Sequence, residues 1–315
     1  MATISFGSEV LVAQGGGPGA VAVSSNGTVV VVILSATSLQ YTVGTCDSSA
    51  MTVSFPYGVY DAYTWSQGDA VSFFDVAMAP DTGQVVLVFQ QGAADQLRYM
   101  VGTLAPGSIS WGPATSFDSG QHPSVTVNGT TVVEMHNSQN NTSKLYYHQG
   151  QISGTTITGF DQSGTSYAGV GYPVRTISTS MNEFYWLLTT VTWVPADNSA
   201  SGSVNYYGSG GNFYQEGLQS GSVTVASNSN VVLFPSGLAL EVHNPNLSNA
   251  VYYTQGTYDQ TYGDKNAGSV AWDQPVEPSI AGVEPDIAAC GPYAVLTYAS
   301  TDGTLSTMAR FVSVS

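Results

Sequence analysis

The chain has 315 residues, of which 43% are hydrophobic and only 8% are charged, so it can bury a large core without a strongly charged surface. Its abundance of Gly, Ser, Thr, Asn and Tyr favours strands and hydrogen-bonded loops, and excludes a helical bundle or a coiled coil. Five basic residues against 21 acidic ones give a net charge of -16, which would repel nucleic acid and anionic membranes.

The longest unbroken apolar run, residues 29–34, is far shorter than the ~20 residues that span a bilayer. The first residues lack the basic and apolar segments of a secretory signal. We therefore expect no membrane insertion, and a protein that is cytoplasmic or is released without a classical signal.

Pairs of short alternating strands recur along the chain. The clearest are residues 21–34 and 125–136, which turn at the Asn-Gly pairs 26–27 and 128–129. Asn-Gly between alternating strands is the strongest short signal for a β-hairpin. Equivalent strand pairs are 75–78 with 85–89, 174–177 with 184–189, 231–234 with 238–243, and 287–289 with 294–298. The sequence therefore predicts six hairpins.

A third strand follows five of the hairpins. Its sequence phrase is a hydrophobic residue, then any residue, then Tyr, and the phrase usually ends in Gly. These tyrosines recur at intervals of roughly 50 residues, a period typical of propellers and solenoids. Packing between sheets is the simplest role for an aromatic residue that recurs in this way. The repeated tyrosines are Tyr41, Tyr99, Tyr147, Tyr206 and Tyr253.

A fourth strand carries an apolar-polar-aromatic phrase. It is clear at residues 53–55, 109–111 and 270–272, and weaker at 157–159. The sixth unit ends after its third strand, but residues 4–7 at the amino terminus, Ile-Ser-Phe-Gly, match the fourth-strand phrase.

We therefore predict an all-β fold, a six-bladed β-propeller of four-stranded antiparallel blades, closed by the amino-terminal strand. Closure of this kind removes the exposed sheet edges. The propeller forms one domain over residues 1–315. The unit at 171–228 is the most degenerate, and its insertion at 196–202 is predicted to be a surface loop.

The stretch 109–147 carries Ile-Ser-Trp-Gly-Pro, His-Pro-Ser-Val, Val-Val-Glu-Met-His-Asn and Leu-Tyr-Tyr in order. It resembles the repeat of the PLL-like (Photorhabdus-type) bacterial β-propeller lectins, and residues 240–253 are a second good match. This resemblance implies non-catalytic, multivalent binding of fucose-like or O-methylated glycans in pockets between blades. The chain departs from that family in keeping Glu-x-His in only two units, in having Tyr for the Trp of the Leu-Trp-Tyr phrase, and in having six blades where seven are usual.

The candidate sugar ligands come from the repeated phrases. Residues two apart on a strand share a face, so the Glu-x-His pairs at 134–136 and 241–243 could present a carboxylate and an imidazole to sugar hydroxyls. The alternative is an architectural hydrogen-bond network, and the Asn after each pair is expected to be more accessible. Aromatic rings stack on the C–H faces of sugars. The candidates are Trp111, Glu134, His136, Asn137, Tyr146, Tyr147, Glu241, His243, Asn244, Tyr252, Tyr253 and Trp272.

No motif indicates catalysis. Arg98, Arg175 and Arg310 occupy different strand positions, so they should not converge as the arginines of a sialidase do. Acids such as Asp75 and Glu241 cannot be paired from the sequence. No calcium loop or zinc-spaced His/Cys cluster is present, so we expect no metal and no cofactor.

We therefore predict a lectin and not an enzyme, with glycans or glycoproteins as partners. A structural or protein-interaction propeller ranks second, and a glycoside-processing enzyme third. The sequence leaves the sugar and the oligomeric state open. Cys46 and Cys290 make no disulfide framework and are expected to be free thiols.

Overall fold

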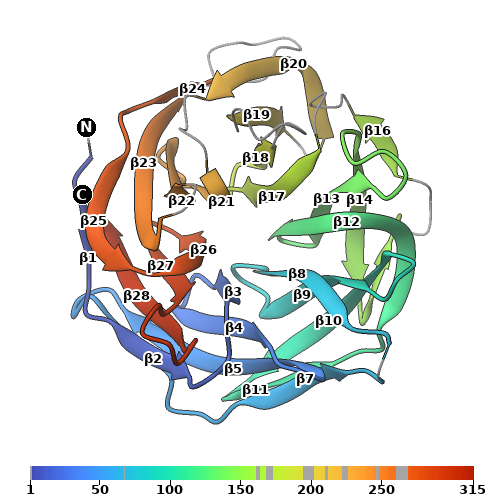
Figure 1. Cartoon of the computed structure of the whole chain (residues 1–315), viewed down its shortest axis with the longest axis horizontal. Helices are drawn as coiled ribbons and strands as arrows, with labels where there is room; N and C mark the ends of the chain where they lie inside the picture. Colours follow the sequence, from blue (N-terminus) through green and yellow to red (C-terminus); the bar gives the residue numbers. More distant parts are fainter. Residues whose placement is uncertain are drawn as a thin grey trace.

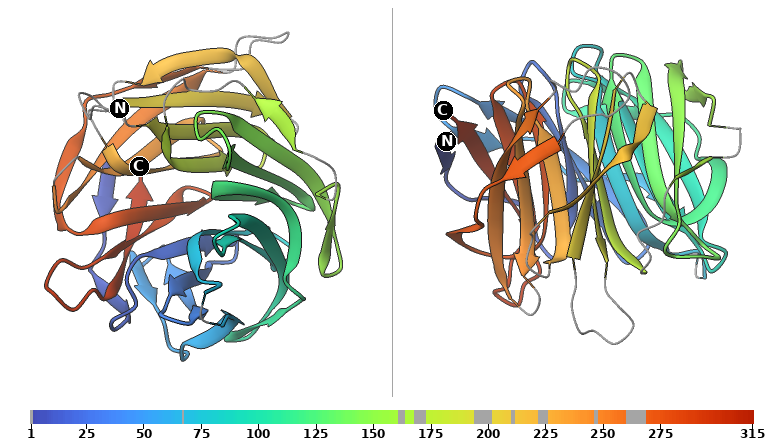
Figure 2. Two further views of the ribbon diagram at one scale, coloured as in Figure 1. Left: turned by 45° about the vertical axis from the view of Figure 1, so that its right-hand side comes forward. Right: turned by 90° about the horizontal axis from the view of Figure 1, so that it is seen from above.

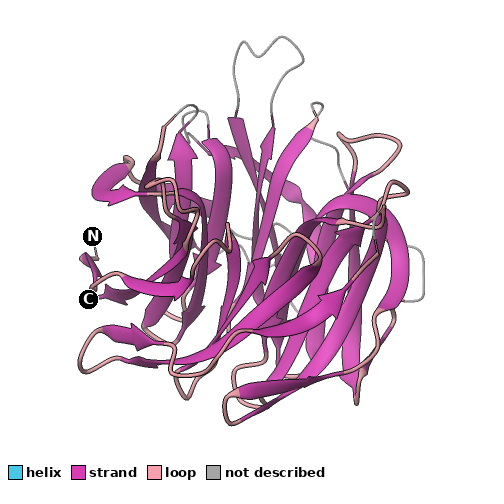
Figure 3. Ribbon diagram, turned by 60° about the horizontal axis from the view of Figure 1, so that its bottom comes forward, coloured by secondary structure: helices cyan, strands magenta, loops and turns pink. Residues whose placement is uncertain are grey.

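The structure is a computed structural model that describes residues 2–66, 68–160, 164–167, 173–193, 202–209, 212–221, 226–245, 248–259 and 269–315. Every regular element within these residues is a β-strand (Figure 3). No helix in this part of the chain is long and apolar enough to cross a membrane. The all-β prediction is confirmed.

The strands form antiparallel sheets arranged around a central axis, as in a β-propeller (Figures 1 and 2). The first sheet contains β3 (Gly19–Val23), β4 (Thr28–Leu34), β5 (Ser38–Asp47) and β6 (Thr52–Ser54), with β7 (Tyr60–Thr64) on β5. The second has nine strands: β8 (Val71–Met78), β9 (Gln84–Gln91), β10 (Gln96–Ala105), β11 (Ser108–Trp111), β12 (Thr115–Asn128), β13 (Thr131–Ser138), β14 (Leu145–Ser153), β15 (Thr156–Thr158) and β16 (Thr165–Tyr167).

Three further sheets complete the described architecture. One contains β17 (Val174–Met181), β18 (Trp186–Trp193), β19 (Gly202–Ser209) and β20 (Asn212–Gly221). The next contains β21 (Ala226–Leu233), β22 (Leu238–Pro245), β23 (Ala250–Asp259) and β24 (Ser269–Trp272), with β25 (Val276–Ala281) on β23. The last contains β26 (Val283–Cys290), β27 (Tyr293–Ala299), β28 (Thr307–Val314) and the amino-terminal strands β1 (Ile4–Phe6) and β2 (Val10–Ala13).

Among the described residues, the strands that surround the axis are β3, β8, β12, β17, β21 and β26, and we call them the inner strands (Figure 1). Each contacts the next in this order, and β26 contacts β3. The inner strands therefore form a closed circle.

The two ends of the chain lie side by side (Figure 1). β1 pairs with β28, so that Ile4 lies opposite Val314 and Phe6 opposite Val312. The amide of Thr3 donates to the carbonyl of Ser315 at 2.7 Å, and the amide of Ser315 donates back at 3.1 Å.

The glycine that closes the third-strand phrase makes room for the aromatic residue of the fourth strand. Gly102 lies opposite Trp111 in the β10–β11 pair, and a Cβ on Gly102 would come within 2.8 Å of the indole. Gly256 has the same relation to Trp272, where that distance is 2.9 Å. A side chain at either glycine would displace the ring.

The repeated tyrosines join neighbouring repeats. Tyr41 and Tyr99 are each 4% exposed. The Tyr41 hydroxyl accepts a hydrogen bond from the Ile109 amide at 3.1 Å, and the Tyr99 hydroxyl accepts one from the Ile157 amide at 3.2 Å. Core packing is therefore confirmed for these two tyrosines, and each hydroxyl bonds a backbone amide of the next repeat.

Polar side chains at one register position tie five of the inner strands to the next one, and β3 has Ala20 at this position. We call them the inner polar ring: Asp75, Ser124, Ser178, Asn230 and Asp286. Four of them accept a backbone N–H of the neighbouring inner strand, and Asn230 donates to a carbonyl there. The acceptor bonds are Val125 N to Asp75 (2.8 Å), Thr179 N to Ser124 (2.9 Å), Val231 N to Ser178 (2.9 Å) and Val21 N to Asp286 (2.7 Å).

Cys46 is a free cysteine whose thiol donates to the carbonyl of Gly27 at 3.3 Å. The side chain of Cys290 lies outside the description. The predicted loop at 196–202 also lies outside the described residues, except that Gly202 begins β19.

Candidate active site

A cavity of about 380 Å³ is lined by residues of all six inner strands, so it lies on the axis. We call it the axial cavity. Its lining includes Asp75, His122, Asn230, Glu284 and Asp286. Because these residues come from three different sheets, only the closed circle of inner strands brings them together.

Asp75 lies in the cavity wall, and its carboxylate is held by backbone and side-chain donors. Oδ2 accepts bonds from the Ser124 hydroxyl at 2.9 Å and the Val125 amide at 2.8 Å, and Oδ1 accepts the Val76 amide at 2.8 Å. Burial raises the pKa of Asp75 to about 6 although these bonds lower it, and the charge of Glu134 adds to the rise. Asp75 is therefore a carboxylate of unusual basicity.

Asp286 lies on the opposite side of β3 from Asp75. Its Oδ2 accepts the Val21 amide at 2.7 Å. Burial raises the pKa of Asp286 to about 8, and the charge of Asp75 raises it further, while the Val21 and Ile287 amides lower it. The matching residue of β3 is Ala20, which also lines the cavity and offers the two carboxylates no counter-charge.

The two carboxyl groups titrate as a coupled pair. Because burial raises the pKa of Asp75 to about 6 and that of Asp286 to about 8, a state with one carboxylic acid and one carboxylate is accessible near neutral pH. A general acid and a base or nucleophile of this kind are what hydrolysis of a glycosidic bond requires. Ser124 and Ser178 make the same inter-strand bond without a charge, so the ring does not need two acids for its architecture.

Two other cavity residues have strained backbones. His122 has φ of 53° and Glu284 has φ of 51°, in the left-handed region that non-glycine residues rarely occupy. Buried asparagines hold both of them. Asn137 Oδ1 lies 2.9 Å from His122 Nδ1, and Asn244 Oδ1 accepts the Glu284 amide at 2.7 Å.

An exposed aromatic surface lies beside the acids. Phe73 is 41% exposed, and its ring centroid lies 4.1 Å from that of His122. Both residues line the axial cavity. Such a surface suits the C–H face of a sugar.

None of the twelve candidates from the sequence lines the axial cavity. The structure groups them by repeat, and their polar members are buried. Asn137 and Asn244, which we expected to be more accessible, are 0% and 1% exposed and support cavity residues from behind. The other polar candidates are Glu134 and Glu241 (0% exposed) and His136 and His243 (1% exposed).

The aromatic candidates pack against side chains of their own repeat or of a neighbouring one. Tyr146 stacks on His136 with centroids 5.9 Å apart, and Tyr252 stacks on His243 at 6.0 Å. Trp111 and Trp272 cover glycines, as described above. Tyr147 lies beside the core of β13 and β17, and Tyr253 beside that of β22 and β26. A sugar-binding role for the twelve residues stays a prediction.

Sequence reasoning did not identify Asp75 and Asp286 as a pair. A signal was present, because each acid precedes the apolar alternation of a predicted inner strand, at the register position that holds Ser124 in β12. Aligning the six units by this position would have placed both acids next to the axis.

No family model and no curated protein matches the chain, so the resemblance to PLL-like lectins stays a prediction. Solved structures do match. The intramolecular trans-sialidase from Ruminococcus gnavus has a TM-score of 0.63 at 8% identity, over 93% of this chain and 94% of that one. The α-L-arabinanase of Penicillium chrysogenum has a TM-score of 0.61 at 9% identity, over 98% of both chains. The PQQ-bound aldose sugar dehydrogenase of Streptomyces coelicolor has a TM-score of 0.55 at 12% identity, over 98% of both chains.

These neighbours contradict two of our predictions. We expected a non-catalytic lectin and a protein that is not an enzyme, whereas the three neighbours are all enzymes named for carbohydrate substrates. The physical reason for the error is that we placed the site between repeats, on side chains that prove to be buried, and left the acids of the inner strands unpaired. At such low identity the likeness itself shows only the fold.

Proposed function

We propose that the chain is a glycoside-processing enzyme that hydrolyses neutral glycosides in the axial cavity. The observation that carries this proposal is the pair of acids, Asp75 and Asp286, which line one cavity and whose pKa values are raised by burial. The carbohydrate-active neighbours support the same class of reaction.

Asp286 is the general acid, since burial and the nearby Asp75 keep it protonated. It donates its proton to the glycosidic oxygen as the C–O bond breaks. Asp75, held by three hydrogen bonds, stays ionised and acts as the base for water or as the nucleophile. Phe73 and His122 stack against the sugar, and Asn228 and Asn230 offer amide groups to its hydroxyls.

The cavity favours an uncharged substrate. Asp75, Asp286 and Glu284 line it, and no Arg or Lys is among the described residues of its wall. A carboxylate on the substrate would meet like charge without a partner. The reaction type of the trans-sialidase is therefore disfavoured, and that of a neutral glycosidase favoured.

We also infer six blades, closed by β1. The nine-stranded sheet divides into β8–β11 and β12–β15, because only the first residues of β12 pair with β10. In the last blade β1 takes the fourth place, on the third strand, β28. Phe6 lies 5.5 Å from the ring of Tyr253, as Trp111 lies 5.9 Å from that of Tyr41, which supports the equivalence of β1 and β11.

The proposal is tested by assaying a panel of neutral aryl glycosides and polysaccharides, including arabinan. We expect hydrolysis that falls by about 10²–10⁴-fold in Asp75→Asn and in Asp286→Asn. Glu277→Gln is the matched control. Glu277 is an exposed acid that lies away from the cavity and accepts a hydrogen bond from the Tyr252 hydroxyl. No hydrolysis across the panel, or hydrolysis that survives both substitutions, contradicts the proposal.

A further inference from the structure

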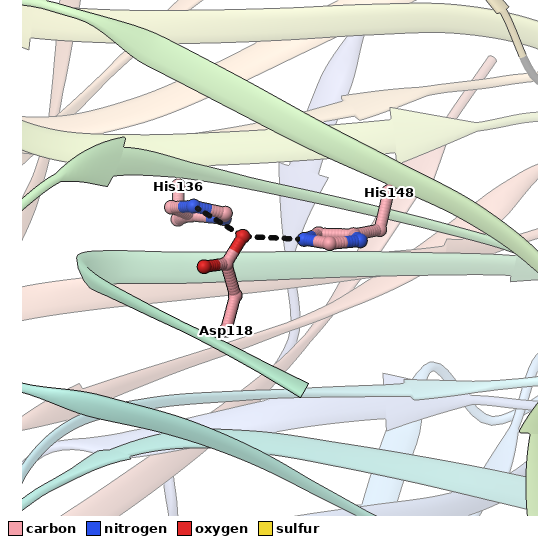
Figure 4. A group of neighbouring side chains, drawn as sticks. All are labelled: Asp118, His136 and His148. Carbon is pink, nitrogen blue, oxygen red and sulfur yellow. Dashed lines mark hydrogen bonds and ion pairs between the residues drawn. The ribbon is translucent and has the colours of Figure 1, made fainter. Parts of the chain in front are cut away.

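A second cluster of ionisable side chains lies in the β12–β14 sheet. Asp118 on β12, His136 on β13 and His148 on β14 turn their polar atoms toward one point (Figure 4). Asp118 Oδ2 lies 3.0 Å from His148 Nε2 and 3.8 Å from His136 Nε2. One ligand atom from each residue lies within 4.8 Å of the other two. None of the three lines the axial cavity.

The buried Glu134 orients one of the histidines. Its carboxylate lies 3.0 Å from His136 Nδ1, on the far side of the imidazole from Asp118. A hydrogen on Nδ1 leaves Nε2 with its lone pair toward the cluster. A carboxylate behind a histidine is the arrangement that fixes metal-binding imidazoles and raises their basicity.

The protein encloses the cluster on several sides. Phe117 meets the His148 ring edge to face at 5.1 Å, and Phe160 lies 5.4 Å from it. A Cβ on Gly164 would come 3.0 Å from His148 Nε2 and 3.4 Å from Asp118 Oδ2. The two histidine side chains are 1% exposed and Asp118 is 28% exposed, so the approach from solvent is along the carboxylate.

We propose that Asp118, His136 and His148 bind one divalent transition-metal ion, with zinc as the preferred ion. Two imidazoles and one carboxylate match the ligand types of zinc, whereas calcium and magnesium take oxygen ligands. Three protein ligands leave a tetrahedral ion one position for water or for a donor atom of a bound molecule. This site is separate from the one proposed for hydrolysis.

The β21–β24 sheet offers an internal comparison. Glu241 and His243 repeat Glu134 and His136, but Thr254 stands opposite Glu241 where His148 stands opposite Glu134. His243 has no hydrogen-bond partner for either ring nitrogen among the described residues. This repeat therefore lacks the second histidine, and we expect it to bind no ion.

The test is calorimetric titration of the full chain, freed of metal with a chelator, with ZnCl₂, CoCl₂ and CaCl₂. We expect one zinc ion per chain, no calcium binding, and visible absorption bands when cobalt occupies the site. His148→Gln and Asp118→Asn should each lower zinc affinity at least ~10-fold, and Glu134→Gln by ~10–100-fold. His243→Gln is the matched control and should leave affinity and stoichiometry unchanged.

The melting temperature of each variant, measured without metal, separates a lost ligand from a lost fold. Asp118→Asn keeps an oxygen acceptor for His148, so it should melt as the wild type does in chelator and gain less stability than the wild type when zinc is added. The proposal is overturned if the wild type binds no zinc, or if several weak ions bind and survive Asp118→Asn. The proposal is also overturned if His243→Gln lowers zinc affinity as much as His148→Gln does.

Discussion

At the scale of single residues, the inner polar ring separates an architectural role from a chemical one. Ser124 and Ser178 accept a neighbour's amide without carrying charge, and Asp75 and Asp286 do the same while placing two carboxyl groups in one cavity. Holding these two acids in buried positions costs stability, because burial disfavours their ionised forms. Residues that lower stability without an architectural need are typical of functional sites.

This cost predicts how stability depends on pH. The folded-state pKa of Asp286 is raised, so the folded chain binds more protons than the unfolded chain between pH ~4 and about 8. Stability therefore falls as pH rises through that window. Asp286→Asn should be more stable than the wild type at pH 8 by about 1–2 kcal/mol, after a discount for exposure to the cavity. The difference should vanish near pH 4.

Chemical denaturation at both pH values measures the effect. Asp302→Asn is the control of opposite sign, because hydrogen bonds from Thr304 lower the pKa of that exposed carboxylate. Asp302→Asn should be less stable than the wild type at neutral pH, whereas Asp286→Asn should be more stable than the wild type. If the Asp286→Asn variant is less stable than the wild type at pH 8, the Asp286 carboxylate has a structural role.

The fourth-strand aromatics predict a second effect at this scale. Gly102→Ala would place a Cβ 2.4 Å from a side-chain carbon of Ile109 and 2.8 Å from the Trp111 indole, so either the ring or the strand must move. Overpacking of this kind costs about 1–3 kcal/mol. Gly58→Ala, whose nearest contact would be 3.8 Å, should change stability far less. Thermal unfolding of the two variants, compared with the wild type, gives the result.

At the scale of elements, the repeats made much of the fold predictable. The hairpin and fourth-strand phrases correspond to strands such as β3–β4 and β11, and the match of residues 4–7 to the fourth-strand phrase corresponds to the pairing of β1 with β28. The candidate site was less predictable because Asp75 and Asp286 lie on strands that neither pair nor follow one another in sequence. The proposed metal ligands follow from register, since Glu134 lies opposite His148, but the sequence alone does not set the strand alignment.

The amino-terminal strand predicts an effect at this scale. Removal of residues 1–8 would delete β1, expose the edge of β28 and remove the contact between Phe6 and Tyr253. We expect the melting temperature to fall by several degrees and the protein to aggregate more readily, because an open edge pairs with other chains. Removal of residues 1–2 leaves β1 intact and is the control. Equal melting of the two truncated proteins would argue against closure by β1.

At the scale of the whole molecule, the charge of the chain predicts its choice of substrate. A net charge of -16 and three acids in the axial cavity should discriminate against anionic glycosides. We expect kcat/KM for a neutral glycoside to exceed that for its uronic acid counterpart by about 100-fold or more. Higher salt should reduce the ratio of the two kcat/KM values only in part, because charges inside a cavity are poorly screened. Equal rates for the two substrates would place the reaction elsewhere.

The pairing of β1 with β28 also has a consequence for how the protein is made. A ribosome synthesises residues 4–6 long before their partners, residues 312–314. Until then the first strand has no partner, and contact between segments so distant in sequence forms slowly. The axial cavity needs all six inner strands, so a nascent chain cannot assemble the Asp75–Asp286 pair before β26 has been synthesised. Activity should therefore appear only after β26 has been synthesised.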